Sequence, residues 1–168
     1  FGPYGVDGLP AQERVVITGA TIWTCRDGTD DTVIEDGAVV ISEGKIQYVG
    51  PSANLPRLAG EFTTIDAKGK FIAPGIIDCH SHTGISRGVN EAGQAVTAEV
   101  RIGDVTDPDN VSWYRQLAGG VTCVNNRHGS VNAIGGQNQV NKIRWGCARP
   151  DDMRLEGAMP GIKFALGE

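Results

Sequence analysis

The segment at residues 74–82, PGIIDCHSH, constrains the fold of this chain more than any other stretch. A short, mostly apolar run follows Pro74-Gly75, which is typical of a parallel strand buried on both faces. Residues two apart on a strand point to the same side, so His80 and His82 should present two imidazoles at the carboxyl end of this strand. The chain has three histidines, and two of them in this position favour half of a metal site over two unrelated structural histidines.

Residues 14–72, which precede this strand, have the pattern of a small antiparallel β-domain. Short runs rich in β-branched and apolar residues lie at 14–24, 37–42, 45–49, 63–66 and 70–72. Glu43-Gly44 separates two of these runs and predicts a β-hairpin turn, and Gly19 predicts a bulge. Residues 1–13 contain three glycines and two prolines and are expected to form an irregular arm.

From residue 73 onward the pattern becomes one of alternating strand and helix. Asp107 and Asp109 predict a helix start, apolar residues recur at helical spacing up to Ala118, and Gly119-Gly120 ends the helix. Residues 121–125 predict a second buried strand, which makes a strand–helix–strand unit of a parallel sheet. Two further segments are a polar, glycine-rich loop at 129–137 and one more short strand at 162–166.

Length and charge exclude several classes of protein. The chain has 168 residues, whereas a complete (β/α)₈ barrel needs about 250. Its net charge is −5 and it has no basic run, so nothing favours a nucleic acid or an anionic membrane surface as partner. No apolar stretch approaches the roughly 18 residues of a membrane-spanning helix, so no span is predicted.

The compartment is undecided from the sequence. The chain begins at Phe1 rather than at Met, which is expected either after removal of a leader or in an excised piece. A cytoplasmic location and a periplasmic or secreted one both fit. The four cysteines (Cys25, Cys79, Cys123 and Cys147) are widely spaced, so we predict free, buried thiols rather than a disulfide framework.

On these residues the chain resembles the metal-dependent amidohydrolase superfamily. Members open with a small β-sandwich and continue with a PGxxDxHxH segment as the first strand of a (β/α)₈ barrel; here that segment is 74–82. Other runs that fit the family, or look like its imidazolonepropionase-like branch, are 44–50, 65–73, 128–137, 144–146 and 161–168. The resemblance implies an α/β fold with part of a small β-sandwich at 14–72. It implies the first half, about four βα units, of a TIM-type barrel at 73–168.

The resemblance also implies roles for single residues. His80 and His82 would bind the more buried metal. In binuclear members a lysine on the fourth barrel strand is carboxylated and bridges two metals, and Lys163 is the candidate because its neighbours are apolar. Lys142 is the competing lysine. Asp78 would support a histidine ligand, or else simply bond local amides at the strand end.

Weaker candidates follow the second predicted strand. His128 would contact substrate or a developing oxyanion, against the alternative of a plain loop histidine. Asn132 and Gln137 are weaker candidates for the same substrate contact. Gly135-Gly136 is interpreted as loop geometry, since no Lys-Ser/Thr follows for a phosphate loop. Cys79 alternates with the two histidines and is assigned to packing.

The metal would be divalent, one ion or two, with Zn²⁺ the first expectation and Mn²⁺, Fe²⁺ or Ni²⁺ as alternatives. The family's site also needs histidines from strands five and six and an aspartate from strand eight, which this chain does not contain. Its small β-domain also usually borrows strands from the far C-terminus. The expected partner is therefore the C-terminal half of the same enzyme, or a second polypeptide, in a homo- or hetero-oligomer.

The expected activity is hydrolysis of a C–N bond through a metal-activated water. The substrate would be a small amide, such as a lactam or other cyclic amide, an N-acyl amino acid or a dipeptide. One alternative is a mononuclear deaminase of the same superfamily, which lacks the bridging lysine. The other is a non-catalytic assembly subunit that keeps the β-domain and half-barrel as a docking surface.

Overall fold

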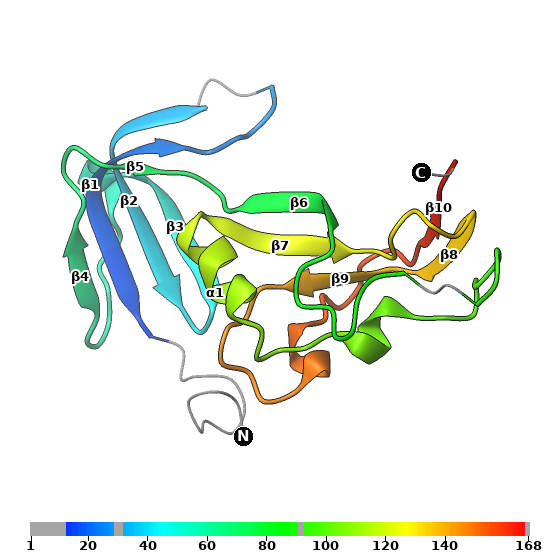
Figure 1. The fold of residues 1–168 in the computed structure, drawn as a ribbon. Coiled ribbons are helices and arrows are strands. Elements are labelled where there is room, and N and C mark those ends of the chain that lie inside the picture. Colours follow the sequence, from blue (N-terminus) through cyan, green and yellow to red (C-terminus); the bar gives the residue numbers. More distant parts are fainter. Residues whose placement is uncertain (1–12, 29–31, 91–92, 167–168) are drawn as a thin grey trace. The chain divides into compact units, whose positions relative to one another are not determined.

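A computed structural model describes residues 13–28, 32–90 and 93–166. Contacts divide the chain into two compact units, one within Ala11–Pro74 and one that contains Gly75–Glu168 (Figure 1). The predicted irregular arm at 1–13 lies outside the described residues except for Glu13. Within the described part, no helix has the length and apolar character that crossing a membrane requires.

The first unit is a β-sheet with the strand order β3-β2-β1-β4, and β5 also pairs with β1. The strands are β1 (Val15–Trp23), β2 (Val33–Ser42), β3 (Lys45–Pro51), β4 (Thr63–Asp66) and β5 (Phe71–Ile72). The hairpin turn occurs at Glu43 and Gly44, both with positive φ, and the register of β1 shifts around Gly19, as the sequence predicts.

The prediction of an antiparallel domain is confirmed for β1, β2 and β3 and is wrong for β4 and β5. Strands β4 and β5 run parallel to β1. The long connection after β3, which includes the 3₁₀ turn Ser52–Asn54, returns the chain to the other side of β1 before β4 begins. Short apolar runs predict strands but carry no information on their direction.

The core of this unit is small. Ala20, Ile22, Val39 and Ala67 form its buried cluster. Beside them lies a hollow of about 560 Å³, whose apolar lining includes Trp23 and Ile46. Trp23 is 50% exposed and Ile46 65% exposed, so a substantial apolar surface remains uncovered within this unit.

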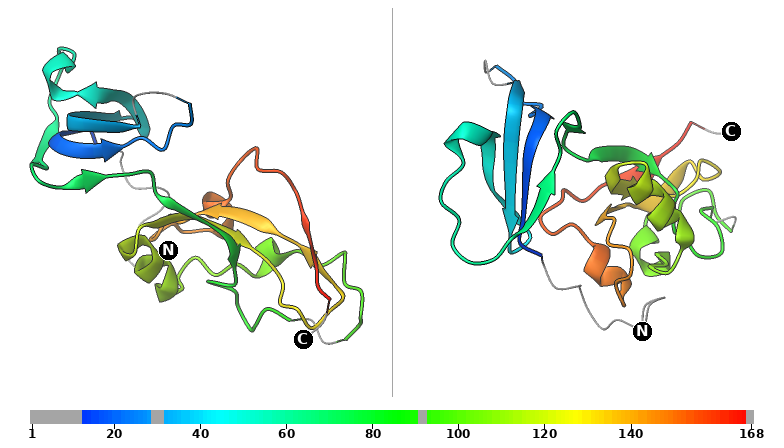
Figure 2. Two further views of the ribbon diagram at one scale, coloured as in Figure 1. Left: turned by 90° about the horizontal axis from the view of Figure 1, so that it is seen from above. Right: turned by 90° about the vertical axis from the view of Figure 1, so that its left-hand side faces the viewer.

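The described residues of the second unit form two small sheets and one α-helix. Figure 2 shows these elements in two further views. The first sheet has the order β6-β7-β9, formed by β6 (Ile76–Ser81), β7 (Val121–Asn126) and β9 (Gln139–Lys142). The second pairs β8 (Ile134–Gln137) with β10 (Ile162–Phe164) in antiparallel fashion. Two 3₁₀ turns, Ile102–Val105 and Pro150–Met153, lie in the connections.

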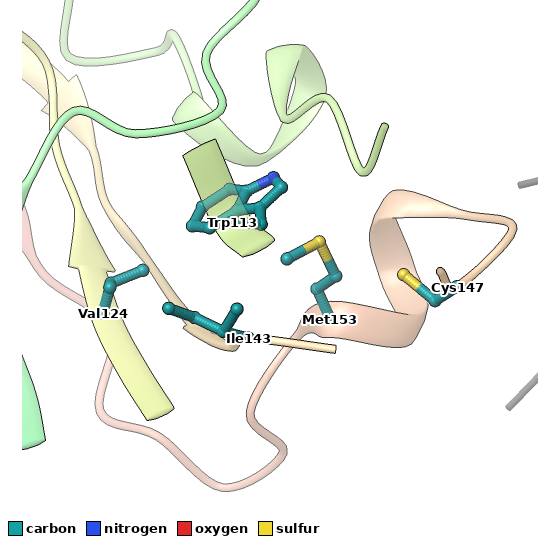
Figure 3. Close-up of a cluster of buried hydrophobic side chains, with 5 residues drawn as sticks. All are labelled: Trp113, Val124, Ile143, Cys147 and Met153. Carbon is teal, nitrogen blue, oxygen red and sulfur yellow. The ribbon is translucent and has the colours of Figure 1, made fainter. Parts of the chain in front are cut away.

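Helix α1 (Val111–Ala118) packs against β7 through the main hydrophobic core. The Asn110 side chain accepts a hydrogen bond from the Ser112 amide and caps the helix, which begins slightly later than Asp107 and Asp109 predict. Gly119 ends it, as predicted. Figure 3 shows the core residues that α1, β7 and the segment after β9 contribute: Trp113, Val124, Ile143, Cys147 and Met153.

The half-barrel with about four βα units is not what the described residues show. Strands β6 and β7 are parallel, as predicted, but β9 runs antiparallel to β7. A parallel partner would need a crossover, usually a helix, whereas the segment between β7 and β9 contains strand β8 instead. The described chain therefore has one strand–helix–strand unit, followed by strands that turn back.

Two predictions about burial also need correction. Strand β6 is largely exposed, with Ile77 at 69%, although the sequence predicts a strand covered on both faces. All four cysteines are free, as predicted, but Cys25 and Cys79 are exposed. Burial raises the pKa of the Cys147 thiol and also that of the Cys123 thiol.

Candidate metal-binding site

The end of β6 brings two imidazole rings together. His80 lies in β6 and His82 directly follows it. Their ring centroids are 5.1 Å apart and the ring planes meet at 73°. Because β6 and β7 are parallel, with Ser81 paired to Asn126, the two histidines lie at a shared carboxyl edge of the sheet. This is the edge at which α/β proteins place ligands.

A backbone carbonyl fixes the tautomer of His82. The His82 Nδ1 atom lies 2.8 Å from the Arg127 carbonyl oxygen. A carbonyl oxygen only accepts hydrogen bonds, so Nδ1 carries the proton and the lone pair is left on Nε2. Histidines that bind metals usually make this kind of bond with their other ring nitrogen.

The charges around His80 favour its neutral form. Desolvation is the largest cause that lowers the pKa of His80, and repulsion from Lys163, from the protonated form of His82 and from Arg127 lowers it further. Asp78 acts in the opposite direction. The Asp78 carboxylate accepts a hydrogen bond of 3.0 Å from the His80 backbone amide, so its observed contact is with the local backbone rather than with an imidazole.

Two further candidate residues, Lys163 and His128, are buried. Lys163 lies in β10 and is 8% exposed, and His128 is 4% exposed. Desolvation lowers the pKa of His128, and His82 and Lys163 lower it further through their charges. The charge of Lys163 thus lowers the pKa of His80 as well as that of His128. Lys142, the competing lysine, is exposed in β9.

Gly135 and Gly136 lie against these buried side chains. A Cβ atom at Gly135 would lie 2.9 Å from His128 Cβ and 3.3 Å from Lys163 Cγ. At Gly136 it would collide with the His128 ring and with the Val100 carbonyl oxygen. Their interpretation as loop geometry is wrong, because both belong to β8 and leave space for His128 and Lys163.

The two amide candidates bind a neighbouring loop. Asn132 is buried, and its Nδ2 donates to the Gln94 carbonyl oxygen at 2.7 Å. Gln137 is exposed at the end of β8, and its Nε2 donates to the Ala98 carbonyl oxygen at 3.2 Å. These bonds hold the backbone of residues 94–98. His128 differs, because its Nδ1 is buried with no hydrogen-bond partner among the described residues.

The donor set fits part of a metal site. His80 and His82 are paired imidazoles, and Lys163 is the nearby buried amine. In the part of the chain that the structure describes, no cluster of three or more His, Cys, Asp or Glu side chains suits a metal ion. The described residues therefore place two imidazoles, a side-chain type that zinc accepts as a ligand, side by side.

Sequence reasoning did not identify the residues that hold His82 in place. Asn126 ends strand β7 and Arg127 follows it, opposite the turn that carries His82. Their position directly after the second parallel strand was the available signal, because the carboxyl ends of adjacent parallel strands meet.

No family model matches the chain. It is 30% identical, over 85% of its length, to an imidazolonepropionase of Roseobacter denitrificans, of which it covers 32%. It is 31% identical, over 82% of its length, to a 5-methylthioadenosine/S-adenosylhomocysteine deaminase of Symbiobacterium thermophilum, of which it covers 34%. A crystal structure of an amidohydrolase from Thermotoga maritima matches 92% of the chain with a TM-score of 0.75 and 31% identity, and the chain covers 39% of it. The chain thus spans about a third of the length of the curated relatives it matches.

Proposed function

Since the chain belongs to the amidohydrolase superfamily, with imidazolonepropionases among its relatives, we propose that it forms the N-terminal part of a metal-dependent amidohydrolase. The reaction would be hydrolysis of a carbon–nitrogen bond in a small amide, lactam or peptide. The observation that carries this proposal is the pair of imidazoles at the end of β6, with the lone pair of His82 left on Nε2.

His80 and His82 would hold a divalent ion, with Zn²⁺ the first expectation for imidazole ligands and Mn²⁺, Fe²⁺ and Ni²⁺ as alternatives. When bound, such an ion lowers the pKa of a coordinated water toward 7 and polarises the carbonyl to be attacked. Desolvation lowers the pKa of His80 and that of His128, which favours their neutral rings, and a neutral His80 ring has a lone pair for coordination.

Lys163 and His128 would complete this chain's share of the site. Lys163, carboxylated by CO₂, would bridge a second ion; its burial among β8 and β10 residues suits such a role better than a surface position would. The His128 ring is buried, and its Nδ1 lacks a partner among the described residues. We keep for His128 the role of contacting the substrate carbonyl or the oxyanion that develops from it.

The remaining ligands and the proton-transferring acid would come from the C-terminal part of the same enzyme or from a second polypeptide. Exposed apolar side chains support a partner on the strands near the site. Ile77 of β6 is 69% exposed and Phe164 of β10 is 65% exposed, more than an isolated soluble unit usually leaves on its strands. A homo- or hetero-oligomer is part of this proposal.

The test is metal analysis and amide hydrolysis with the natural protein, together with any chain that co-purifies with it. We expect bound divalent metal, and we expect His80→Ala and His82→Ala to remove both metal and activity. Lys163→Gln should lower metal content, whereas the matched change Lys142→Gln on the exposed strand should leave it unchanged. Metal and activity that survive in both histidine variants would overturn the proposal and favour a non-catalytic assembly subunit.

A mononuclear deaminase is the second candidate, because one relative is named a deaminase and is 31% identical. The two candidates differ at Lys163. Mass spectrometry under native conditions should find one CO₂ adduct on this lysine in a binuclear amidohydrolase. An unmodified Lys163, one metal per chain and ammonia release from an amino-substituted heterocycle would favour the deaminase.

A further inference from the structure

The turn that carries His82 is held from the end of β7. The Arg127 amide donates to the Ser81 carbonyl oxygen at 3.0 Å, and the Arg127 carbonyl oxygen accepts from His82 Nδ1 at 2.8 Å. Both contacts use the backbone of residue 127. One contact holds the backbone just before His82, and the other holds the His82 ring.

Asn126 holds the chain just after His82. Its Nδ2 donates to the Thr83 carbonyl oxygen at 2.9 Å, and the side chain is completely buried. Because a carbonyl oxygen can only accept, the contact needs a donor at this position. An aspartate of the same shape would lose the bond and place a negative charge against the carbonyl dipole.

We infer that Asn126 is a positioning residue for His82. By holding the Thr83 carbonyl, it keeps His82 where Nδ1 reaches Arg127 and leaves the lone pair on Nε2 for a metal ion. This inference rests on the proposed function, because it takes His82 as a metal ligand. The Asn126 side chain donates to the Thr83 carbonyl rather than to the His82 ring, so its effect passes through the backbone of the turn.

Asn141 is the matched comparison for Asn126. It is also completely buried, in the same sheet, but its Oδ1 accepts a hydrogen bond from Gln139 Nε2. An aspartate at position 141 keeps this acceptor. Asn141→Asp and Asn126→Asp therefore introduce the same charge at the same burial, and only the second removes a bond to the His82 turn.

The experiment measures Zn²⁺ affinity by competition with a chromophoric chelator in the natural protein and its variants. Loss of an outer hydrogen-bonding partner of a metal ligand typically weakens binding about 10–100-fold. We expect that loss for Asn126→Asp and less than a threefold change for Asn141→Asp. If Asn126→Asp does not fold, Asn126→Ala removes the donor without adding a charge and should weaken Zn²⁺ binding in the same way.

A second readout follows the His82 ring directly. Nitrogen NMR of the metal-free protein should show His82 protonated on Nδ1, and Asn126→Asp or Asn126→Ala should mix the two tautomers. Equal Zn²⁺ affinity in wild type and both Asn126 variants, or an equal loss in Asn141→Asp, would overturn the inference. If wild type and His82→Ala bind Zn²⁺ equally poorly, the proposed function fails. The positioning role then stands if Asn126 variants disturb the tautomer, and falls if they do not.

Discussion

Two edges of the second unit flank the candidate site, and they are built in different ways. At the β6–β7 edge, the Arg127 carbonyl accepts a hydrogen bond from His82 Nδ1, and the Arg127 amide and Asn126 Nδ2 donate to the carbonyls on either side of His82. The β8–β10 edge surrounds His128 and Lys163 by close packing against Gly135 and Gly136. At the β6–β7 edge, hydrogen-bond donors and acceptors fix the position of the histidine. At the β8–β10 edge, the missing side chains of the two glycines leave the space that His128 and Lys163 fill.

This difference predicts which substitutions each edge tolerates. Added atoms should damage the packed edge, because its neighbours include backbone, which cannot move aside cheaply. Lost donors should damage the bonded edge even when the shape of the side chain is kept. The following changes test the comparison in order of expected size.

The largest effect should come from Gly136→Ala. The new Cβ would collide with the His128 ring and the Val100 carbonyl oxygen, and overpacking of this kind costs about 2–3 kcal/mol in free energy of unfolding. Urea denaturation measures the loss. Gly119→Ala is the control, since its Cβ would lie at an ordinary 3.4 Å from the Gln116 carbonyl oxygen. Equal midpoints for the two variants would show that the packed edge yields easily.

His128 should make stability depend on pH. Burial lowers its pKa in the folded state below the ordinary value of about 6.5, so the unfolded chain binds more protons in this range. Stability should therefore be full above pH 6.5 and fall as the pH drops below it. His128→Leu should flatten this fall and, by removing an unpaired buried nitrogen, gain up to about 1 kcal/mol at pH 7.

Urea denaturation of the metal-free protein from pH 5 to 8 checks this prediction. His80 also has a lowered pKa, but its ring is exposed, so only a small part of the pH dependence should remain in His128→Leu. An unchanged pH profile in the variant would mean that His128 is already paired or solvated in the folded protein.

The smallest effect should come from the bonded edge, at Thr83. Its hydroxyl accepts a hydrogen bond of 2.9 Å from Gln116 Nε2 of α1. Thr83→Val keeps the shape and removes this partner, for a loss of about 1 kcal/mol. Equal unfolding free energies for wild type and Thr83→Val would show that this hydrogen bond does not contribute to stability.

Sequence reasoning predicted the elements with strong local signals. The hairpin at Glu43-Gly44, helix α1 and strands β6 and β7 all follow from turn residues, capping or apolar runs. Strand β8 was missed because Gly135 and Gly136 carry no side chain that signals a strand, and its pairing with β10 depends on residues far along the chain. The parallel direction of β4 was missed because a four-residue run does not encode direction.

The candidate site divides in the same way. His80 and His82 could be paired from the sequence because residues two apart on one strand share a side. Asn126 could not be linked to Thr83, since their contact joins residues 43 positions apart and depends on how β6 aligns with β7. Burial of Lys163 agrees with its apolar neighbours, whereas the burial of His128 depends on β8, which sequence reasoning did not identify.

The carbonyl that accepts from His82 belongs to the backbone of Arg127. Every amino acid supplies the same carbonyl, so evolution can exchange the side chain at this position without losing the contact. The tautomer of His82 thus depends on the path of the backbone at residue 127 rather than on which side chain that residue carries. Substitutions at position 127 other than proline, which would lose the amide bond to Ser81, should leave this bond intact while they change the charge beside His80.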